Sequence, residues 1–345
     1  DLAENKVQEL LNQGKSFTIR LKVPKGETEF TDLVYGTIKV QNKDLDDFII
    51  ARSDGSPTYN FVVAVDDSDM NISHVVRGDD HLANTPKQIL VYRALGLDEP
   101  IFAHLPMILG SDKKRLSKRH GAPGMQNFKD KGYFPDTILN YLALLGWNPK
   151  NEKEVLDADE LINLFSFDQV QKKGAAWDEK KLHWLSGQHV QNKNSQFLLD
   201  QIRLLDSDWG KNSDISTLIN IINSLKPRAK SLHEFIAKSK HFFIAPDTYD
   251  EAERLKAWPD SNATKIVGQC SDILTSLDTW SSEVLESEIK SFASKKSYGL
   301  GRVIMPLRLA VFGSLDGPAL FDIISILGKT ETLHRIQDAS TRMPR

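Results

Sequence analysis

Apolar and polar positions alternate in the early part of the chain. Residues 16–23 alternate apolar and polar side chains, which predicts a half-buried strand. Residues 35–40 and 47–52 are further strand candidates, because each is bounded by Asp, Asn or Gly. Residues 1–14 carry the apolar spacing of a short helix that ends at Gly14. The start of the chain therefore predicts a short helix followed by a small β-rich region.

Longer apolar runs follow. Residues 58–65 (TYNFVVAV) are almost continuously apolar, which is typical of a strand covered on both faces of a parallel sheet. Residues 72–77 and 101–109 predict two more strands. Between them, Thr85-Pro86-Lys87-Gln88 predicts a capping box that opens a helix. This order predicts half of a doubly wound nucleotide-binding sheet, whose ligands bind beyond the carboxyl ends of the strands.

From residue 134 onward, apolar residues recur every three or four positions, which is the period of a helix. A polar stretch over residues 191–195 reads as a linker. The fold class predicted is therefore α/β with a partial β-rich domain, followed by an all-α carboxyl-terminal region. The helices expected in this part of the chain cover residues 135–145, 178–185, 197–205, 215–225, 232–237, 263–277, 282–292, 302–312, 319–327 and 333–339.

Composition narrows the classes of function. The 345 residues are 40% apolar and 26% charged, as in ordinary globular proteins, and the net charge is −3. Polyanion binding must then come from local basic patches. A single cysteine, Cys270, excludes an intrachain disulfide and a cysteine-rich zinc site. No apolar run approaches the ~18 residues of a membrane span, so we expect no membrane partner.

Two polar clusters follow predicted strands. The first is a basic loop after residues 101–109, and cations beside glycines suit a polyphosphate held close to the backbone. On its own, such a loop is as often a solvated surface. The second cluster ends the strand over residues 72–77, so the two could share one cleft. The clusters contain Lys113, Lys114, Arg115, Lys118 and Arg119, and Arg77, Asp79, Asp80 and His81.

The order Arg115-Leu116-Ser117-Lys118-Arg119 resembles the KMSKS signature loop of class I aminoacyl-tRNA synthetases. The form RLSKRHGA after HLPMIL resembles the glutamyl-tRNA synthetase version of that loop. The segments PTYNFVVAVDD and SHVVRGDDHLANTP resemble the matching block of that family. GPALFDIISILGKTETLHRI resembles its anticodon-binding helices, so the resemblance spans nearly the whole chain.

The resemblance implies a role for each matching residue. Lys118 is expected to be catalytic, because it contacts the triphosphate and stabilises the departing pyrophosphate. Tyr59 and Arg77 are expected to bind the glutamate side chain, since a planar guanidinium can pair with both oxygens of a carboxylate. Magnesium is expected to arrive with ATP, and no metal or zinc bound by the protein is expected. The ATP-binding residues expected are Lys118, Arg115, Asp80, His81, Met107 and Ile108.

The resemblance also implies an activity and a domain order. Glutamate would be activated by ATP to glutamyl-adenylate and transferred to the 3′-terminal ribose of tRNA(Glu), by a monomer in the cytoplasm or an organellar matrix. The remnant of a connective domain is expected over residues 1–63, and the second half of the catalytic domain over 64–112. The signature loop and a helical stem-contact domain would cover 113–192, and an anticodon-binding domain 193–345.

One departure from the family pattern affects the expected activity. No HIGH-type motif is present, so the chain resembles an amino-terminally truncated synthetase that we expect to be inactive alone. A non-catalytic tRNA-binding module and a glutaminyl-type synthetase are the alternatives. A loose basic group is equally consistent with RNA phosphates and with a solvated face. It comprises Lys226, Arg228, Lys230, Lys238 and Lys240.

Overall fold

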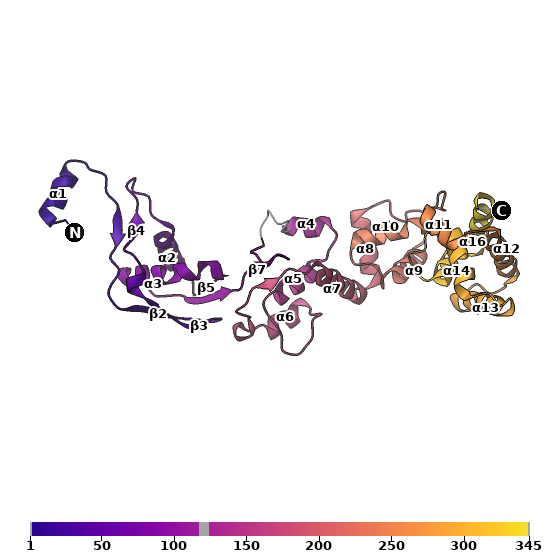
Figure 1. Ribbon diagram of the computed structural model, residues 1–345, viewed down its shortest axis with the longest axis horizontal. Helices are drawn as coiled ribbons and strands as arrows, with labels where there is room; N and C mark the ends of the chain where they lie inside the picture. Colours follow the sequence, from indigo (N-terminus) through magenta and orange to yellow (C-terminus); the bar gives the residue numbers. More distant parts are fainter. Residues whose placement is uncertain (1, 117–123, 344–345) are drawn as a thin grey trace. The chain divides into compact units, whose positions relative to one another are not determined.

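The computed structural model describes residues 2–116 and 124–343, and the chain divides into two compact units (Figure 1). The first unit comprises Asp1–Ala122 and Leu139–Asp178. The second comprises Pro123–Ile138 and Glu179–Arg345. The first unit is α/β and the second is helical, which confirms the predicted fold class.

A four-stranded sheet lies at the centre of the first unit, in the order β3-β2-β6-β5. Strand β6 is parallel to both of its neighbours, and β3 is antiparallel to β2. The sheet joins strands from both sides of residue 63. Its strands are β2 (Glu27–Asp32), β3 (Gly36–Gln41), β5 (His74–Gly78) and β6 (Ile101–Leu105).

Strand β6 is covered on both faces, because successive residues of a strand point to opposite sides of the sheet. Phe102 lies in a core with residues of helices α2 (Tyr59–Asp69) and α3 (Thr85–Leu95), among them Ala64 and Ile89. Ala103 points the other way, into a second core with Trp147, Leu156 and Leu161. The carboxyl end of β6 is therefore held rigidly between two packed layers.

The strand predicted over residues 58–65 is wrong, because these residues begin helix α2. A short apolar run does not distinguish a buried strand from a buried helix, so its neighbours decide. Here Ala64 is fully buried against α3, and the helix continues through Asp66 to Asp69. Strand β2 occupies the position in the sheet that the predicted strand would have filled. Its buried residues are Thr28, Phe30 and Asp32, and because two of them are polar, the sequence did not show the apolar–polar alternation of a strand.

Two smaller predictions also fail. Residues 101–109 form two strands, β6 and β7 (Ile108–Leu109), because Pro106 cannot donate a ladder hydrogen bond. Strand β7 pairs with β8 (Ala175–Ala176). The capping box at the start of α3 is absent, since no side chain caps that helix. A capping box is present further on, where Asp157 and Glu160 cap α6 (Ala158–Leu164) reciprocally.

The predicted strands over residues 16–23 and 47–52 are confirmed as an antiparallel pair. The short amino-terminal helix and the helix predicted from residue 135 are confirmed as well. The elements not yet located are α1 (Glu4–Asn12), β1 (Ile19–Leu21), η1 (Asn42–Asp44), β4 (Phe48–Ala51), η2 (Asp79–Asn84), α5 (Pro135–Leu144) and η4 (Phe167–Gln169).

Most helices of the second unit pack around one large apolar core. Its helices after residue 194 run from pink to yellow in Figure 1. Every helix predicted for this part of the chain is present, and α4 and α11 are additions that were too short to show a period. In the part of the chain that is described, no helix has the length and apolar character needed to span a membrane. The helices are α4 (Met125–Asp130), α7 (Glu179–Asn192), α8 (Ser195–Leu205), α9 (Ile215–Leu225), α10 (Leu232–Phe243), α11 (Glu251–Ala257), α12 (Ser261–Ser276), α13 (Ser282–Lys295), α14 (Leu300–Phe312), α15 (Leu320–Leu327) and α16 (Lys329–Arg342).

Candidate active site

A row of polar side chains crosses the carboxyl ends of three parallel strands in the first unit. Asp32 ends β2, His104 is near the end of β6, and Arg77 is near the end of β5. Arg77 and His104 are paired residues in the ladder between β5 and β6. The carboxyl edge of a parallel sheet is where ligands of doubly wound folds bind. The row therefore marks the candidate site.

The guanidinium of Arg77 is oriented by three hydrogen bonds. Nε donates to Nε2 of His104 at 3.2 Å. Nη2 donates to Oγ1 of Thr85 and to Oε1 of Gln88, both at 2.8 Å. The Gln88 amide is oriented in turn, because its Nε2 donates to Oδ1 of Asn60 at 3.2 Å. Thr85 and Gln88 are the residues expected to form a capping box at the start of α3. Their side chains accept hydrogen bonds from Arg77 instead.

His104 must be neutral and in one tautomer for this arrangement. Its Nδ1 lies 2.6 Å from Oδ2 of Asp32, and both side chains are completely buried. Because a carboxylate only accepts, Nδ1 carries the proton and donates it, and Nε2 keeps the lone pair that accepts from Arg77. Burial lowers the pKa of His104, with Asp32 opposing and Arg77 reinforcing that shift.

All three partners of the Arg77 guanidinium are therefore uncharged. Among residues 2–116 and 124–343, Arg77 forms no ion pair with a carboxylate. Burial lowers the pKa of Arg77, while Tyr59 and Asp67 oppose that shift. Nη1 takes part in none of the three bonds. The carboxylate of Asp67 acts on Arg77 only from beyond ion-pair distance. A half-buried cation whose direct hydrogen-bond partners are all uncharged is suited to an anionic ligand, because the ligand can supply a direct counter-charge.

Tyr59 and His81, predicted for glutamate and ATP respectively, lie side by side. Tyr59 begins α2 and is 50% exposed, and its Oη is 3.5 Å from Nδ1 of His81. Their ring centroids are 6.0 Å apart at 46°. Tyr59 also interacts with Arg77. The structure thus brings three of the predicted residues to the same end of the sheet.

Asp79 and Asp80 are each engaged by the protein. Oδ2 of Asp79 accepts from the phenol of Tyr35 at 3.0 Å, and burial, with that bond, raises the pKa of Tyr35 to about 12. Oδ2 of Asp80 lies 2.9 Å from Nη1 of Arg115. Across the described ranges, no three His, Cys, Asp or Glu residues are grouped so that they could hold a metal ion. These carboxylates therefore position neighbouring groups.

The backbone of Met107 and Ile108 is also used by the fold. The carbonyl of Met107 accepts from the amide of Ala175 at 3.0 Å, and that of Ile108 accepts from the amide of Leu116 at 2.8 Å. Each carbonyl has a second lone pair, so a further donor can still bind. Arg115 and Leu116 are described, whereas Ser117, Lys118 and Arg119 lie outside the described residues.

Sequence reasoning missed Asp32, His104, Thr85 and Gln88 as parts of the site. His104 stands in the sequence without the spacing of a ligand cluster, and Asp32 lies in the strand that was not predicted. Only the row of strand ends brings Asp32 beside His104, although they are 72 positions apart in the chain. One signal was available in the sequence. Thr28 and Asp32 are polar residues at inward-facing positions of β2, where an amphipathic strand would carry apolar residues.

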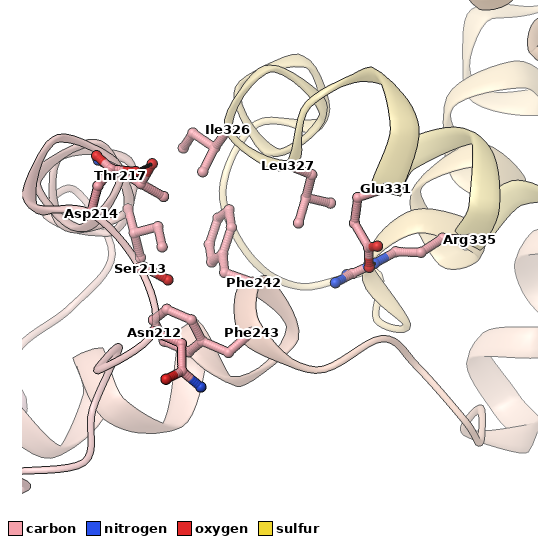
Figure 2. Close-up of a pocket in the computed structure, with 11 residues that line it drawn as sticks. Asn212, Ser213, Asp214, Thr217, Phe242, Phe243, Ile326, Leu327, Glu331 and Arg335 are labelled. Atoms are coloured by element: carbon pink, nitrogen blue, oxygen red, sulfur yellow. Dashed lines mark hydrogen bonds and ion pairs between the residues drawn. The ribbon is translucent and has the colours of Figure 1, made fainter.

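A cavity of about 420 Å³ lies in the helical unit (Figure 2). Its charged groups are already engaged. Asp214 caps α9 by accepting from the amide of Thr217 at 2.9 Å, and Glu331 pairs with Nε of Arg335 at 2.7 Å. Because these charged groups pair within the protein, the strand-end row is the better candidate.

The loose basic group of the helical unit is partly neutralised. Lys238 pairs with Glu234 at 2.7 Å, and Arg228 lies 3.9 Å from Asp316. Lys226 donates to the carbonyl of Lys193. These bonds leave fewer mobile cations for phosphates than the sequence suggested.

Two family models match the chain in succession. The model described as "tRNA synthetases class I (E and Q), catalytic domain" matches residues 1–184. The model described as "Anticodon binding domain" matches residues 189–340.

Individual proteins are similar over nearly the full length of the chain. A "Glutamate--tRNA ligase" of Moorella thermoacetica is 38% identical over 338 residues, which is 96% of this chain and 69% of that protein. The protein of the same name from Syntrophotalea carbinolica is 40% identical over 331 residues, covering 95% of this chain and 71% of that protein. A crystal structure of a glutamate tRNA ligase from Elizabethkingia meningosepticum, in complex with its amino acid, aligns with a TM-score of 0.86. It is 32% identical and covers 99% of this chain and 72% of that one.

Proposed function

The chain belongs to the glutamate–tRNA ligase family of class I tRNA synthetases, and from this membership we propose that it takes part in attaching glutamate to tRNA(Glu). In that reaction a carboxylate oxygen of glutamate attacks the α-phosphorus of ATP, and pyrophosphate leaves. The glutamyl group of the adenylate then passes to the 3′-terminal ribose of the tRNA, and AMP is released. The attacking carboxylate is ionised at neutral pH, so no protein base is needed for the first step.

The orientation of Arg77 by uncharged partners, with no direct ion pair, is the observation that carries the proposal. Glutamate and glutamine differ only in a carboxylate against an amide, so discrimination needs a cation that the amide cannot neutralise. Because Nε and Nη2 are held by His104, Thr85 and Gln88, we assign the carboxylate contact to Nη1. This replaces the two-nitrogen contact expected from the sequence. Tyr59 stands beside Arg77 and supplies a phenol that can donate to the same carboxylate.

The ATP side of the site is proposed from the residues around His81. His81 is half-buried beside Tyr59 and offers an imidazole face to adenine. Met107 and Ile108 offer backbone groups to the adenine edge. Asp80 holds Arg115 at 2.9 Å, so that cation is positioned at the start of the signature loop. Magnesium would enter with ATP as part of the substrate, coordinated mainly by phosphate and water.

Binding of glutamate tests the assignment directly. We expect calorimetry on the 345-residue chain to show that glutamate binds more tightly than glutamine. Arg77→Lys should lose most of this preference, because an ammonium has only three N–H groups and cannot donate to His104, Thr85 and Gln88 and also to the carboxylate of glutamate. Arg93→Ala is the matched control: Arg93 belongs to the same unit, is exposed, and pairs with Glu99 away from the site. Equal preference in wild type and Arg77→Lys would contradict the proposed role of Arg77.

A gel-shift titration with tRNA(Glu) separates the proposal from the alternatives. The match of residues 189–340 to an anticodon-binding domain supports binding of tRNA by the helical unit. Binding of tRNA without binding of glutamate or ATP would favour a non-catalytic tRNA-binding module. Tighter binding of glutamine than of glutamate would favour a glutaminyl-type synthetase.

Lys118 is tested by its effect on rate. If this lysine neutralises charge that develops on pyrophosphate, Lys118→Ala should lower kcat for adenylate formation by about 10²–10³, with little change in KM for glutamate. The measurement is glutamate-dependent ATP–pyrophosphate exchange, made in a protein that contains this chain and catalyses the exchange. Lys113→Ala is the control in the same loop. A rise only in KM for tRNA would assign the loop to RNA binding.

A further inference from the structure

The buried pair of Asp32 and His104 is polar, although the His104 ring packs against the core residue Phe102 with ring centroids 6.3 Å apart. An apolar pair of similar volume would avoid the cost of burying a carboxylate and an imidazole in the sheet. Neither side chain is exposed at all, so neither can touch a substrate. The pair does contact two groups of the site: Nε2 of His104 accepts from Nε of Arg77 at 3.2 Å and lies 3.1 Å from Oγ1 of Thr85.

We propose that Asp32 and His104 are positioning residues for amino-acid recognition. Asp32 fixes the tautomer of His104, and His104 then accepts from Arg77 without neutralising its charge. A carboxylate in the place of His104 would hold Arg77 equally well but would cancel the charge that selects glutamate. The inference adds to the proposed function. It rests on the proposed function only in the experiments that measure glutamate binding.

The two oxygens of Asp32 have separate tasks, which makes the proposal testable. Oδ1 accepts from the backbone amides of Val34 and Tyr35, each at 2.9 Å, and from the backbone amide of His104 at 3.4 Å. Oδ2 accepts from Nδ1 of His104 at 2.6 Å. In Asp32→Asn the three backbone amides keep the single remaining oxygen at the position of Oδ1, so the new NH₂ group faces the imidazole of His104. Nδ1 must then accept, and the imidazole proton moves to Nε2, which can no longer accept from Arg77.

Nitrogen-15 NMR of the imidazole detects this change, because protonated and unprotonated ring nitrogens have distinct chemical shifts. Wild type should carry the proton on Nδ1 of His104, and Asp32→Asn should carry it on Nε2. The Nε–H signal of Arg77 should exchange faster with solvent in the variant. An unchanged tautomer together with an unchanged Arg77 signal would overturn the proposal, whether or not glutamate binds.

Two substitutions of His104 separate positioning from packing. His104→Gln places an amide oxygen where Nε2 lies and can still accept from Arg77, whereas His104→Asn reaches only the position of Nδ1 beside Asp32. We expect His104→Gln to keep glutamate affinity within a few-fold. His104→Asn and Asp32→Asn should each weaken it by about tenfold or more, as for loss of a hydrogen bond to a charged group. Glutamine affinity should change much less. If the pair only stabilised the core, the two His104 variants would bind glutamate alike, and the proposal would be wrong.

Arg77→Ala in the same titration distinguishes this failure from failure of the proposed function. If Arg77→Ala binds glutamate as well as wild type, Arg77 does not read the substrate and the proposed function is at fault. If Arg77→Ala loses glutamate while Asp32→Asn and His104→Asn keep it, only the positioning role is refuted. Thermal melting of each variant shows whether it is folded. If an asparagine variant is not folded, the Nε–H signal of Arg77 is compared between wild type and His104→Gln instead.

Discussion

At the scale of the residue, the hydrogen-bond partners of a cation determine whether its charge remains able to select an anionic ligand. Arg77 is held by an imidazole, a hydroxyl and an amide, so its orientation is fixed and its charge is kept. A salt bridge would also orient the side chain but would remove the charge. Neutral partners are costly in a half-buried setting, because they compensate less of the lost hydration. We infer that this cost is tolerated at Arg77 because the retained charge is needed to bind a carboxylate.

Truncating Arg77 should remove this selectivity. We expect Arg77→Ala to weaken glutamate binding by about 1.5–3 kcal/mol, the range for hydrogen bonds to charged groups. Glutamine should lose far less, because its amide gains little from the cation. Titration calorimetry with both amino acids measures the ratio, and Arg93→Ala should leave it unchanged. If the ratio is the same in Arg77→Ala, something other than Arg77 reads the side chain.

At the scale of the element, single polar residues decide how helices join. Arg335 of α16 is 2% exposed, and its Nη1 donates to the carbonyls of His241 in α10 and Val311 in α14 at 2.5 and 3.0 Å. Its Nε pairs with Glu331 at 2.7 Å. One side chain thus joins three helices of the second unit, and it fills one wall of the cavity in Figure 2.

Removing this side chain should destabilise the helical unit. Arg335→Ala leaves two helix-end carbonyls buried without their donor, so we expect a loss of about 2–4 kcal/mol in the free energy of unfolding. Arg342→Ala is the control, because Arg342 is on the same helix and 45% exposed. Chemical denaturation followed by circular dichroism measures both. Equal stability of the two variants would show that the Arg335 bonds contribute nothing net.

The capping box of α6 gives a smaller, cleaner test in the first unit. Oδ1 of Asp157 accepts from the amide of Glu160 at 2.8 Å, and Oε2 of Glu160 accepts from the amide of Asp157 at 3.2 Å. Asp157→Ala should cost about 0.5–2 kcal/mol of stability. Asp159→Ala removes a carboxylate from the same turn without removing a cap, so it should cost less. Indistinguishable denaturation midpoints would contradict the cap's contribution.

At the scale of the whole molecule, each unit contains a histidine that folding keeps neutral. Burial lowers the pKa of His104 in the first unit, where Asp32, Arg77 and Asp79 are the charged groups that face it. Burial also lowers the pKa of His241 in the second unit, where Lys240 and Arg335 add to the shift and Asp247 opposes it. In both cases the unfolded chain binds the proton more readily than the folded chain.

Stability should therefore fall as the solution is made acidic. Above a pH of about 6.5 both states are neutral and the full stability is present. As pH falls from there toward the folded pKa, the free energy of unfolding should drop by at most about 1.4 kcal/mol per pH unit for each histidine. Urea denaturation at several pH values tests this. His241→Asn should reduce the slope, while His334→Asn, at an exposed position on α16, should not. A slope unaffected by His241→Asn would refute its contribution.

The sequence by itself determined the helical second unit and the strands with clear alternation, because these patterns need only one apolar face. It also placed Arg77 at the carboxyl end of a strand and matched the family through the signature loop. The same local information misled at residues 58–65, where an apolar run suits strand and helix alike and only packing against α3 decided for the helix.

The environment of Arg77 was decided by the tertiary structure alone. Asp32, Arg77 and His104 come from three strands that are distant in the chain, and they meet because parallel pairing aligns the carboxyl ends of those strands. Thr85 and Gln88 had the spacing of a capping box, and their recruitment by Arg77 follows from the way α3 packs beside β5. Local sequence can name the residue that carries the charge. Whether that charge is kept or cancelled depends on partners that only the folded sheet brings within hydrogen-bond distance.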